Sequence, residues 1–235
     1  MILPRFIAHR GANRLAPENT LKAFKVAEAH GAKMFECDVL LSQDGIPVIF
    51  HDDTLERCTN GQGLIREASF AYLQTLNAGE GERIPSLFQL LDWFKHSKML
   101  MNLELKYAHP TDFPTPLVQS VCEQIAPFQN RILISSFHWE ALYQVRKIFP
   151  HITIGLLIDE ANLTRWGLAG IVEWVNKLQA FSLHCDLNLL TAARIQAFLK
   201  MSPHLLAYTV NDPEVTTRLF QAGVEAVFSD HLSSV

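Results

Sequence analysis

Short apolar runs alternate with longer amphipathic segments along most of the chain. Eight of these runs have the length and composition of buried strands: 6–9, 34–41, 99–106, 132–136, 153–158, 180–184, 205–210 and 225–229. Helical patterns lie between most of them, at 20–31, 86–96, 115–125, 140–149, 168–178, 191–200 and 213–223. In the first of these, Leu21, Phe24 and Ala27 recur at three-residue steps, roughly on one helical face. The pattern therefore predicts eight strands joined mainly by helices.

Strands that alternate with helices pair in parallel through crossover helices. Eight is the number of strands that closes a (β/α)8 TIM barrel, and such barrels usually have ~250 residues. The 235 residues of this chain are close to that length. We expect an α/β fold of this kind, with an open doubly wound sheet as the structural alternative, because periodicity does not separate the two.

One apolar run, at 46–52, breaks the alternation because only a tight turn separates it from the second predicted strand. Asp44-Gly45 is a strong signal for a two-residue hairpin loop. If these two residues form the loop, Asp38 lies opposite His51. Cross-strand partners have Cβ atoms ~4.5–5.5 Å apart. The sequence therefore predicts an antiparallel hairpin after the second strand in which a carboxylate meets a histidine.

Residues 53–85 show no clear strand or long helix and are rich in turn signals, such as TNGQG and NAGEGERIPS. The segment is too small for an independent domain, so we expect one catalytic domain over 1–235 with a small insertion at 53–85. Long excursions at the top of a barrel often cover substrate.

The composition argues against a nucleic-acid-binding, a membrane-spanning or a secreted protein. The chain is 49% apolar and 19% charged, with a formal net charge of -4, and it has no basic patch that would favour nucleic acid. No apolar run approaches the ~20 residues of a membrane span, and the N-terminus does not have the pattern of a signal peptide. The four cysteines, Cys37, Cys58, Cys122 and Cys185, are scattered, which indicates a reducing compartment. We expect a soluble cytoplasmic protein.

Charged side chains interrupt the apolar runs where strands end. His9 and Arg10 end the first strand, and His51 ends the hairpin strand. Glu36 and Asp38 lie two apart in the second strand, as do Glu104 and Lys106 in the third parallel strand. Residues two apart on a strand share a face. Because the active site of a barrel lies at the C-terminal ends of its strands, we expect these side chains to converge on one rim.

The chemistry of this set favours a metal ion and a phosphate. Crowded buried carboxylates are costly unless a cation joins them, and a set of oxygen ligands favours Mg²⁺ or Ca²⁺ over zinc. The charges of Glu36, Asp38 and Glu104 add to -3, a divalent ion brings the sum to -1, and Arg10 and Lys106 bring it to +1. That excess suits one anion, and the planar fork of an arginine matches phosphate.

Two histidines at the same rim can supply a general base and a general acid, so the set suggests phosphodiester cleavage. No serine or cysteine nucleophile is paired with a base, and there is no GxSxG or Gly-rich phosphate loop. A single strand-end histidine is more often structural, so the hypothesis depends on the whole set. Phe137 could line the pocket or belong to the core, and His184 is similarly open. Asn19 or Thr20 is expected to cap the first helix rather than to touch substrate.

The motifs HRG, PENT, ECDV, DGIPVIFHD, TNGQG, NLELK, SSF, YTVND and GVEAVFSD, in this order over nearly the whole chain, resemble the glycerophosphodiester phosphodiesterase family of the bacterial, cytosolic type. Two positions depart from the family pattern. Tyr208 stands where the family usually has Trp, and Ser229 precedes Asp230 where the family usually has a Thr-Asp pair. The first change keeps an aromatic side chain but adds a hydroxyl, which bears on head-group preference.

The resemblance implies a TIM barrel that hydrolyses glycerophosphodiesters, such as glycerophosphocholine or glycerophosphoethanolamine, to glycerol 3-phosphate and an alcohol, in lipid and glycerol metabolism. The roles it implies are one divalent ion, Mg²⁺, Ca²⁺ or Mn²⁺, on Glu36, Asp38 and Glu104, acid–base catalysis by His9 and His51, and phosphate binding by Arg10 and Lys106, with Phe137 and Tyr208 as candidate pocket residues. In the family a substrate hydroxyl is thought to attack the phosphorus first, and water then opens a cyclic phosphate.

Two alternatives stay open at the level of sequence. One is a related two-histidine barrel phospholipase or lyase that stops at the cyclic phosphate. The other is a catalytically idle barrel that binds phosphodiesters. We expect a small-molecule substrate and neither nucleic acid nor a membrane span.

Overall fold

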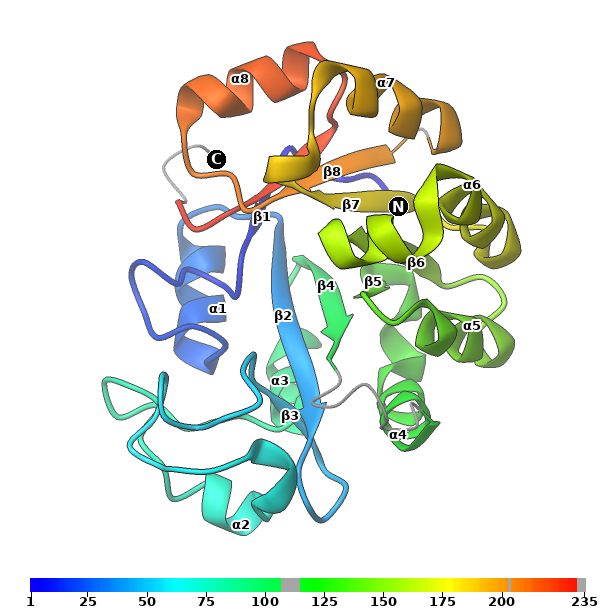
Figure 1. The fold of residues 1–235 in the computed structure, drawn as a ribbon. Helices are drawn as coiled ribbons and strands as arrows, with labels where there is room; N and C mark the ends of the chain where they lie inside the picture. Colours follow the sequence, from blue (N-terminus) through cyan, green and yellow to red (C-terminus); the bar gives the residue numbers. More distant parts are fainter. Residues whose placement is uncertain (107–114, 203, 232–235) are drawn as a thin grey trace.

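The computed structural model of the chain describes residues 1–106, 115–202 and 204–231 (Figure 1). Its eight parallel strands are β1 (Phe6–Ala8), β2 (Met34–Leu41), β4 (Leu100–Leu105), β5 (Ile132–Ser136), β6 (Thr153–Ile158), β7 (Ser182–Asp186), β8 (His204–Tyr208) and β9 (Ala226–Ser229). They pair in the order β1-β9-β8-β7-β6-β5-β4-β2. Strand β1 also pairs with β2, which closes the sheet into a barrel and excludes the open doubly wound alternative.

Helices follow the strands and lie on the outside of the barrel (Figure 1). They are α1 (Leu21–Ala29), α3 (Leu87–Phe94), α4 (Thr115–Ile125), α5 (Trp139–Ile148), α6 (Glu160–Leu178), α7 (Ala192–Met201) and α8 (Pro213–Gln221). Each lies where the apolar periodicity predicts it, but α6 begins eight residues before the predicted 168. Asp159 caps this additional segment by accepting a hydrogen bond from the backbone N–H of Asn162, and Gly167 then breaks the helical geometry at φ 57°. Because this glycine interrupts the apolar periodicity, the sequence pattern did not predict the first part of the helix.

The hairpin forms, but its predicted register was wrong by one residue. Strand β3 (Pro47–Ile49) runs antiparallel to β2, with Leu41 opposite Pro47 and Val39 opposite Ile49. The backbone N–H of Phe50 donates to the carbonyl oxygen of Asp38 at 3.0 Å, so Phe50 and not His51 faces Asp38. The loop has three residues, because Gly45 adopts a left-handed φ of +77° after the turn. Three-residue loops of this kind are a common alternative to the two-residue hairpin.

The segment 53–85 packs against this hairpin and forms no long helix or strand. Its only regular elements are η1 (Ile65–Glu67) and α2 (Phe70–Leu73). Side chains of the hairpin and of the segment together form a buried apolar cluster: Leu40, Val48, Phe50, Leu55, Ile65, Ala68, Leu73, Leu76, Ala78 and Ile84. The segment is therefore fixed to the barrel at the end of β2 and β3. Its description as a small insertion in a single domain over 1–235 stays a prediction.

The interior of the barrel is apolar at the end where the strands begin. Ile7, Met34, Leu133, Leu206 and Phe228 form a cluster there and are at most 3% exposed. A second, larger apolar layer separates the strands from the surrounding helices. The charged side chains that line the described pocket lie at the opposite end, where the strands terminate. Within the described part of the chain, no helix has the length and apolar character needed to cross a membrane.

Candidate active site

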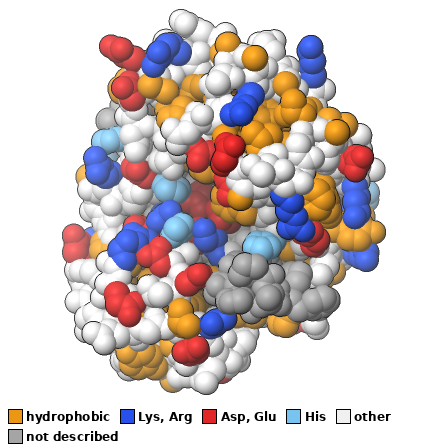
Figure 2. Space-filling model, viewed as in Figure 1, with side chains coloured by type: hydrophobic (Ala, Val, Ile, Leu, Met, Phe, Trp, Pro, Cys, Tyr) orange, Lys and Arg blue, Asp and Glu red, His pale blue; other side chains and the backbone are white. Residues whose placement is uncertain are grey.

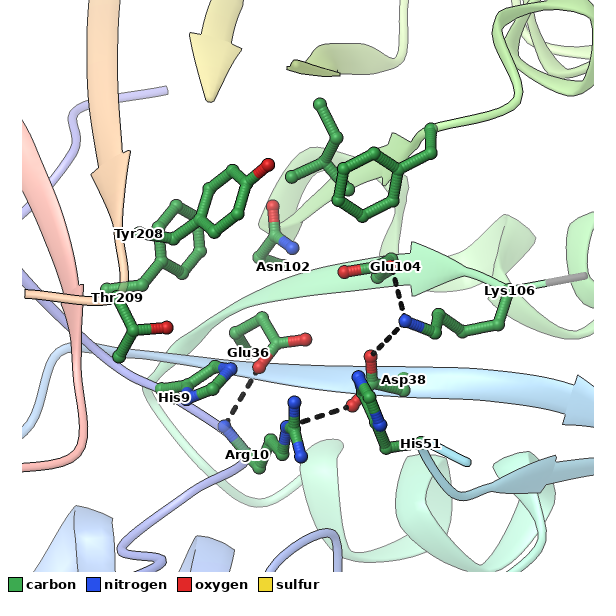
Figure 3. Close-up of a pocket in the computed structure, with 13 residues that line it drawn as sticks. His9, Arg10, Glu36, Asp38, His51, Asn102, Glu104, Lys106, Tyr208 and Thr209 are labelled. Carbon is green, nitrogen blue, oxygen red and sulfur yellow. Dashed lines mark hydrogen bonds and ion pairs between the residues drawn. The ribbon is translucent and has the colours of Figure 1, made fainter. Parts of the chain in front are cut away.

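A pocket opens at the C-terminal ends of the strands and has an empty volume of about 500 Å³. Its lining residues are His9, Arg10, Glu36, Asp38, His51, Asn102, Glu104, Lys106, Phe137, Leu157, Tyr208, Thr209 and Phe228. On the surface, charged and histidine side chains gather around a hollow, with hydrophobic side chains over α6 beside it (Figure 2). All nine residues that the sequence put forward therefore lie around one pocket (Figure 3).

Three carboxylates from two neighbouring strands meet in this pocket. Asp38 and Glu104 are register partners on β2 and β4, and Glu36 lies two residues before Asp38 on the same face. One oxygen from each of the three lies within 4.8 Å of the others, and none of the residues is more than 9% exposed. Burial, together with the neighbouring carboxylates, raises the pKa of Glu36 well above its ordinary value and that of Glu104 to about 7. Such an oxygen-only set, poorly compensated by its surroundings, fits a hard divalent cation.

The two cations of the site flank the carboxylates. Arg10 Nε lies 3.5 Å from Asp38 Oδ2, and Lys106 Nζ lies 3.1 Å from Glu104 Oε1 and 3.8 Å from Asp38 Oδ1. Burial alone would lower the pKa of Lys106, but Glu104 and Asp38 outweigh it and raise the pKa above its ordinary value. Both side chains are therefore positively charged at neutral pH and stand at the pocket wall, where an anion can reach them.

The backbone after β1 turns sharply to bring Arg10 to the rim. Arg10 has a φ of 55° and Gly11 a φ of +79°, and the backbone N–H of Arg10 donates to Glu36 Oε2 at 2.9 Å. A Cβ atom on Gly11 would lie 2.8 Å from the backbone of Ala23 in α1. Only glycine combines this conformation with so close an approach to the helix.

His9 is anchored through one ring nitrogen. Its Nδ1 lies 2.7 Å from Asp230 Oδ1, just after β9. Asn13 and Asn211 also donate to this carboxylate, at 2.5 and 2.7 Å. Because Nδ1 is engaged, exchange of a proton with a molecule in the pocket falls to Nε2. These hydrogen bonds also hold the pKa of Asp230 well below its ordinary value, against the effect of burial.

His51 has the same arrangement with a different partner. Its Nδ1 lies 2.5 Å from Oδ1 of Asp52, the next residue in the chain. Burial lowers the pKa of His51 below its ordinary value, although the negative charge of Asp38 opposes this. Figure 3 shows His9 and His51 on either side of Arg10, with Glu36 and Asp38 beside them. The carboxylate and the histidine that the hairpin was expected to bring together do share the pocket, although they are not register partners.

Aromatic and aliphatic side chains form the wall opposite the charged residues. The rings of Phe137 and Tyr208 meet edge to face, with centroids 6.0 Å apart, and Leu157 and Phe228 complete the wall. Tyr208 donates its hydroxyl to the backbone carbonyl of Ile158 at 3.0 Å. The hydroxyl that distinguishes this residue from tryptophan is therefore directed at the protein, and the pocket meets the ring.

The structure settles two open questions, which residue caps α1 and where His184 lies. Thr20 caps α1 by accepting a hydrogen bond from the backbone N–H of Ala23 at 3.2 Å. Asn19 instead donates to Asp38 Oδ2 at 2.8 Å and so fixes one of the carboxylates. His184 lies inside the barrel, is fully buried, and hydrogen-bonds Ser182 at 2.8 Å. Burial lowers the pKa of His184 to about 3, which keeps it neutral.

Several residues of the site were missed from the sequence, among them one that lines the pocket and two that hold the histidines. Asn102 lies two residues before Glu104 on the same face of β4, so the alternation that selected Glu104 and Lys106 could have found it. Its Nδ2 donates to Ser135 Oγ at 2.9 Å. Asp52 and Asp230 were seen only as parts of motifs, because their contacts with the histidines are set by the folded chain.

The fold and the site define a (β/α)8 barrel whose strand ends carry a candidate metal centre, two cations and two histidines. The glycerophosphoryl diester phosphodiesterase family matches residues 9–234, and the chain belongs to this family. It is 33% identical over 234 residues to a glycerophosphodiester phosphodiesterase of Caldanaerobacter subterraneus, a match that covers 95% of this chain and 93% of the relative.

Solved structures agree with this assignment. A phosphodiesterase of Oleispira antarctica, in complex with the product sn-glycerol-3-phosphate, is 34% identical with a TM-score of 0.85. The match covers 97% of this chain and 93% of the other. A glycerophosphodiester phosphodiesterase of Thermotoga maritima is 26% identical with a TM-score of 0.78, over 100% of this chain and 97% of the other.

Proposed function

We propose that this chain hydrolyses glycerophosphodiesters to glycerol 3-phosphate and an alcohol with the aid of one divalent cation. The observation that carries the proposal is the pair of histidines, each held through Nδ1 by an aspartate, at a pocket that also holds a carboxylate cluster and two cations. Family membership and the product bound by the Oleispira antarctica relative support the same substrate class.

The ionic groups are assigned to metal and phosphate. Glu36, Asp38 and Glu104 would hold the cation, Mg²⁺, Ca²⁺ or Mn²⁺, because their oxygens are close together, buried and poorly compensated. When bound, the ion would neutralise charge on the phosphate oxygens. Arg10 and Lys106 would hold the phosphate, the arginine with its planar fork and the lysine as a point charge.

His9 and His51 act as general acid and general base. No serine or cysteine is among the residues that line the described pocket, and no base is hydrogen-bonded to the hydroxyl of Thr209, which does line it. The attacking group therefore comes from the substrate or from water. In the first step one histidine takes the proton of a glycerol hydroxyl, which attacks the phosphorus. The other histidine gives a proton to the departing alcohol, and a cyclic phosphate forms. In the second step the two roles reverse, water opens the ring, and glycerol 3-phosphate is released.

The apolar wall suits the carbon chain of the glycerol. Phe137, Leu157 and Tyr208 offer a surface without a hydrogen-bond donor or acceptor directed at the pocket, because the Tyr208 hydroxyl is already engaged. A small substrate can thus place its phosphate against Arg10 and Lys106 and its carbon atoms against the rings. Nothing in this wall distinguishes a choline from an ethanolamine head group, so we expect both to be accepted.

The experiment is a product analysis with metal-loaded protein. Glycerophosphocholine and glycerophosphoethanolamine are each incubated with the protein and Mg²⁺, Ca²⁺ or Mn²⁺, and the products are followed by ³¹P NMR. We expect glycerol 3-phosphate, and no turnover of a substrate analogue that lacks the 2-hydroxyl group. Accumulation of a persistent cyclic phosphate would favour the lyase alternative. Binding without turnover under every condition would favour the idle barrel.

We also propose a cytoplasmic location. All four cysteines are free thiols, and Cys37, Cys122 and Cys185 are buried. Disulfides form and persist in oxidising compartments, whereas cytosolic proteins keep their thiols reduced. Detection of the protein in the soluble cytosolic fraction of its own cells would test this.

A further inference from the structure

Arg57, in the segment 53–85, is not among the residues that line the pocket. It binds Glu18 and Asp52, two carboxylates that are each hydrogen-bonded to a pocket residue. We infer that Arg57 is a positioning residue for the proposed reaction, which holds Arg10 and His51 in place through two intervening carboxylates. The inference rests on the proposed function and adds a role for the insertion. It is carried by the geometry of one guanidinium group.

Two edges of the Arg57 guanidinium each hold a carboxylate. Nη1 and Nη2 donate to the two oxygens of Glu18 at 2.9 and 2.8 Å. Nε and Nη2 donate to the two oxygens of Asp52 at 2.5 and 2.8 Å. Two bidentate contacts on one planar group fix the orientation of both carboxylates relative to each other, which a lysine cannot do.

Each of these carboxylates in turn holds a pocket residue. Glu18 Oε1 accepts from Arg10 Nη1 at 2.7 Å, and Asp52 Oδ1 pairs with His51 Nδ1. The side chains thus form a continuous row, His51–Asp52–Arg57–Glu18–Arg10, that begins and ends in the pocket. The segments that carry Glu18 and Asp52 follow different strands, β1 and β3, so Arg57 is the group that joins them.

The charges in the row are balanced only while Arg57 is present. With Arg57 and Arg10 positive and Glu18 and Asp52 negative, the four groups sum to zero. Without Arg57, Glu18 and Asp52 would form two neighbouring negative charges that repel. The two carboxylates would then be free to move apart, and the side chains of Arg10 and His51, which are hydrogen-bonded to them, would move as well.

A purely structural role for Arg57 fits the structure less well. The side chain is 48% exposed, and ion pairs at such positions contribute little to stability. The surrounding loop is fixed without it. The backbone N–H of Leu55 donates to the carbonyl of Gly63 at 3.0 Å, that of Thr59 donates to Leu55 at 3.0 Å, and the Leu55 side chain is fully buried. The two bidentate contacts of Arg57 therefore serve to position the pocket residues and not to hold the loop together.

The test compares Arg57→Ala and Arg57→Lys with Arg66→Ala, which removes an exposed arginine from the same segment. Steady-state kinetics on glycerophosphodiesters and the melting temperature are measured for each metal-loaded protein. Loss of a group that orients a site residue typically costs about 10–100-fold in activity, and we expect a fall of this size in kcat/KM for both Arg57 variants. We expect Arg66→Ala to match the wild type, and all melting temperatures to stay close together.

Two further measurements separate positioning from folding. Free guanidinium ion at concentrations that do not unfold the protein should restore part of the activity of Arg57→Ala, because the site is open to solvent. The ¹⁵N signals of the His51 ring should differ between wild type and Arg57→Ala, and this readout needs no turnover. If the wild type hydrolyses no glycerophosphodiester, the proposed function fails while the His51 signals still test Arg57. Unchanged kinetics and His51 signals in Arg57→Ala would overturn the inference, as would a loss of activity matched by a loss of melting temperature without rescue.

Discussion

His9 Nδ1 lies 2.7 Å from Asp230 Oδ1, although 221 residues separate them in the chain. The contact exists because β1 and β9 are neighbours in the closed barrel, with Ala8 opposite Ser229. An imidazole that donates from Nδ1 to a carboxylate presents Nε2 in a fixed tautomer and a fixed direction. Closure of the barrel therefore fixes the tautomer and the orientation of His9, one of the two proposed proton-transfer groups.

Asp230→Asn tests this relationship. The amide keeps the size of the side chain and loses the charge that orients the imidazolium, so we expect kcat to fall about 10–100-fold with little change in KM. Steady-state kinetics across pH would check it, with Asp212→Asn, at the exposed start of α8, as the control. An unchanged kcat would mean that the His9–Asp230 contact has no part in catalysis.

Replacing the histidines themselves has a larger expected effect. His9→Ala and His51→Ala each remove a proton-transfer group, and such groups contribute typically about 10²–10⁴-fold to the rate. The exposed His151, away from the pocket, gives a matched control in His151→Ala. Measurement of kcat for the three variants decides the matter, since near wild-type turnover in either pocket variant would contradict the acid–base assignment.

Removal of the cation should abolish turnover, and the stability of the metal-free protein should depend on pH. In the metal-free protein the folded state raises the pKa of Glu104 from 4.5 to about 7. A raised pKa contributes stability that is fully present below 4.5 and is lost as the pH rises through about 7. In EDTA, melting temperatures should therefore fall from pH 5 to pH 8 by more in the wild type than in Glu104→Gln.

The same measurement after addition of Mg²⁺, Ca²⁺ or Mn²⁺ serves as the control. Binding requires deprotonated carboxylates, so the cation should raise the melting temperature of the wild type most at the higher pH. Parallel pH profiles for wild type and Glu104→Gln in EDTA would argue against the buried carboxylate cluster. Full turnover in EDTA would argue against the metal.

Tyr208→Phe should leave catalysis unchanged, because the hydroxyl is bound to the carbonyl of Ile158 and does not face the pocket. Loss of that hydrogen bond should lower the free energy of unfolding by about 0.5–1.5 kcal/mol. Tyr208→Ala, which removes the ring, should raise KM. Urea denaturation and kinetics on the two variants distinguish these effects. A changed head-group preference in Tyr208→Phe would show that the hydroxyl reaches the substrate.

The parts of the site that the sequence predicted are those governed by local periodicity. Glu36 and Asp38 were predicted to share a strand face, as were Glu104 and Lys106, and the fold class predicted that the ends of their strands meet at one rim. Spacing along one strand is visible in the sequence, so the alternation of strand faces, together with the predicted barrel, was sufficient to predict that these carboxylates converge.

The rest depended on geometry that the sequence does not encode locally. The left-handed conformation of Gly45 shifted the hairpin register by one residue. The sequence around Asp44-Gly45 is compatible with a loop of either two or three residues. The partners of His9 and Arg57 are joined through barrel closure and loop packing across long separations. Such contacts depend on the positions of several segments at once, which hydrophobic patterning does not fix.

The pairing of the first strand with the last also has a consequence for biosynthesis. At a translation rate of about 5–20 residues per second, about 10–45 s pass between the synthesis of His9 and that of Asp230. During that interval β1 has only β2 as a neighbour, and the imidazole has no carboxylate to orient it. The nascent chain is thus expected to carry its carboxylates and Arg10 well before it can hydrolyse a phosphodiester, and activity should begin only once β9 has left the ribosome.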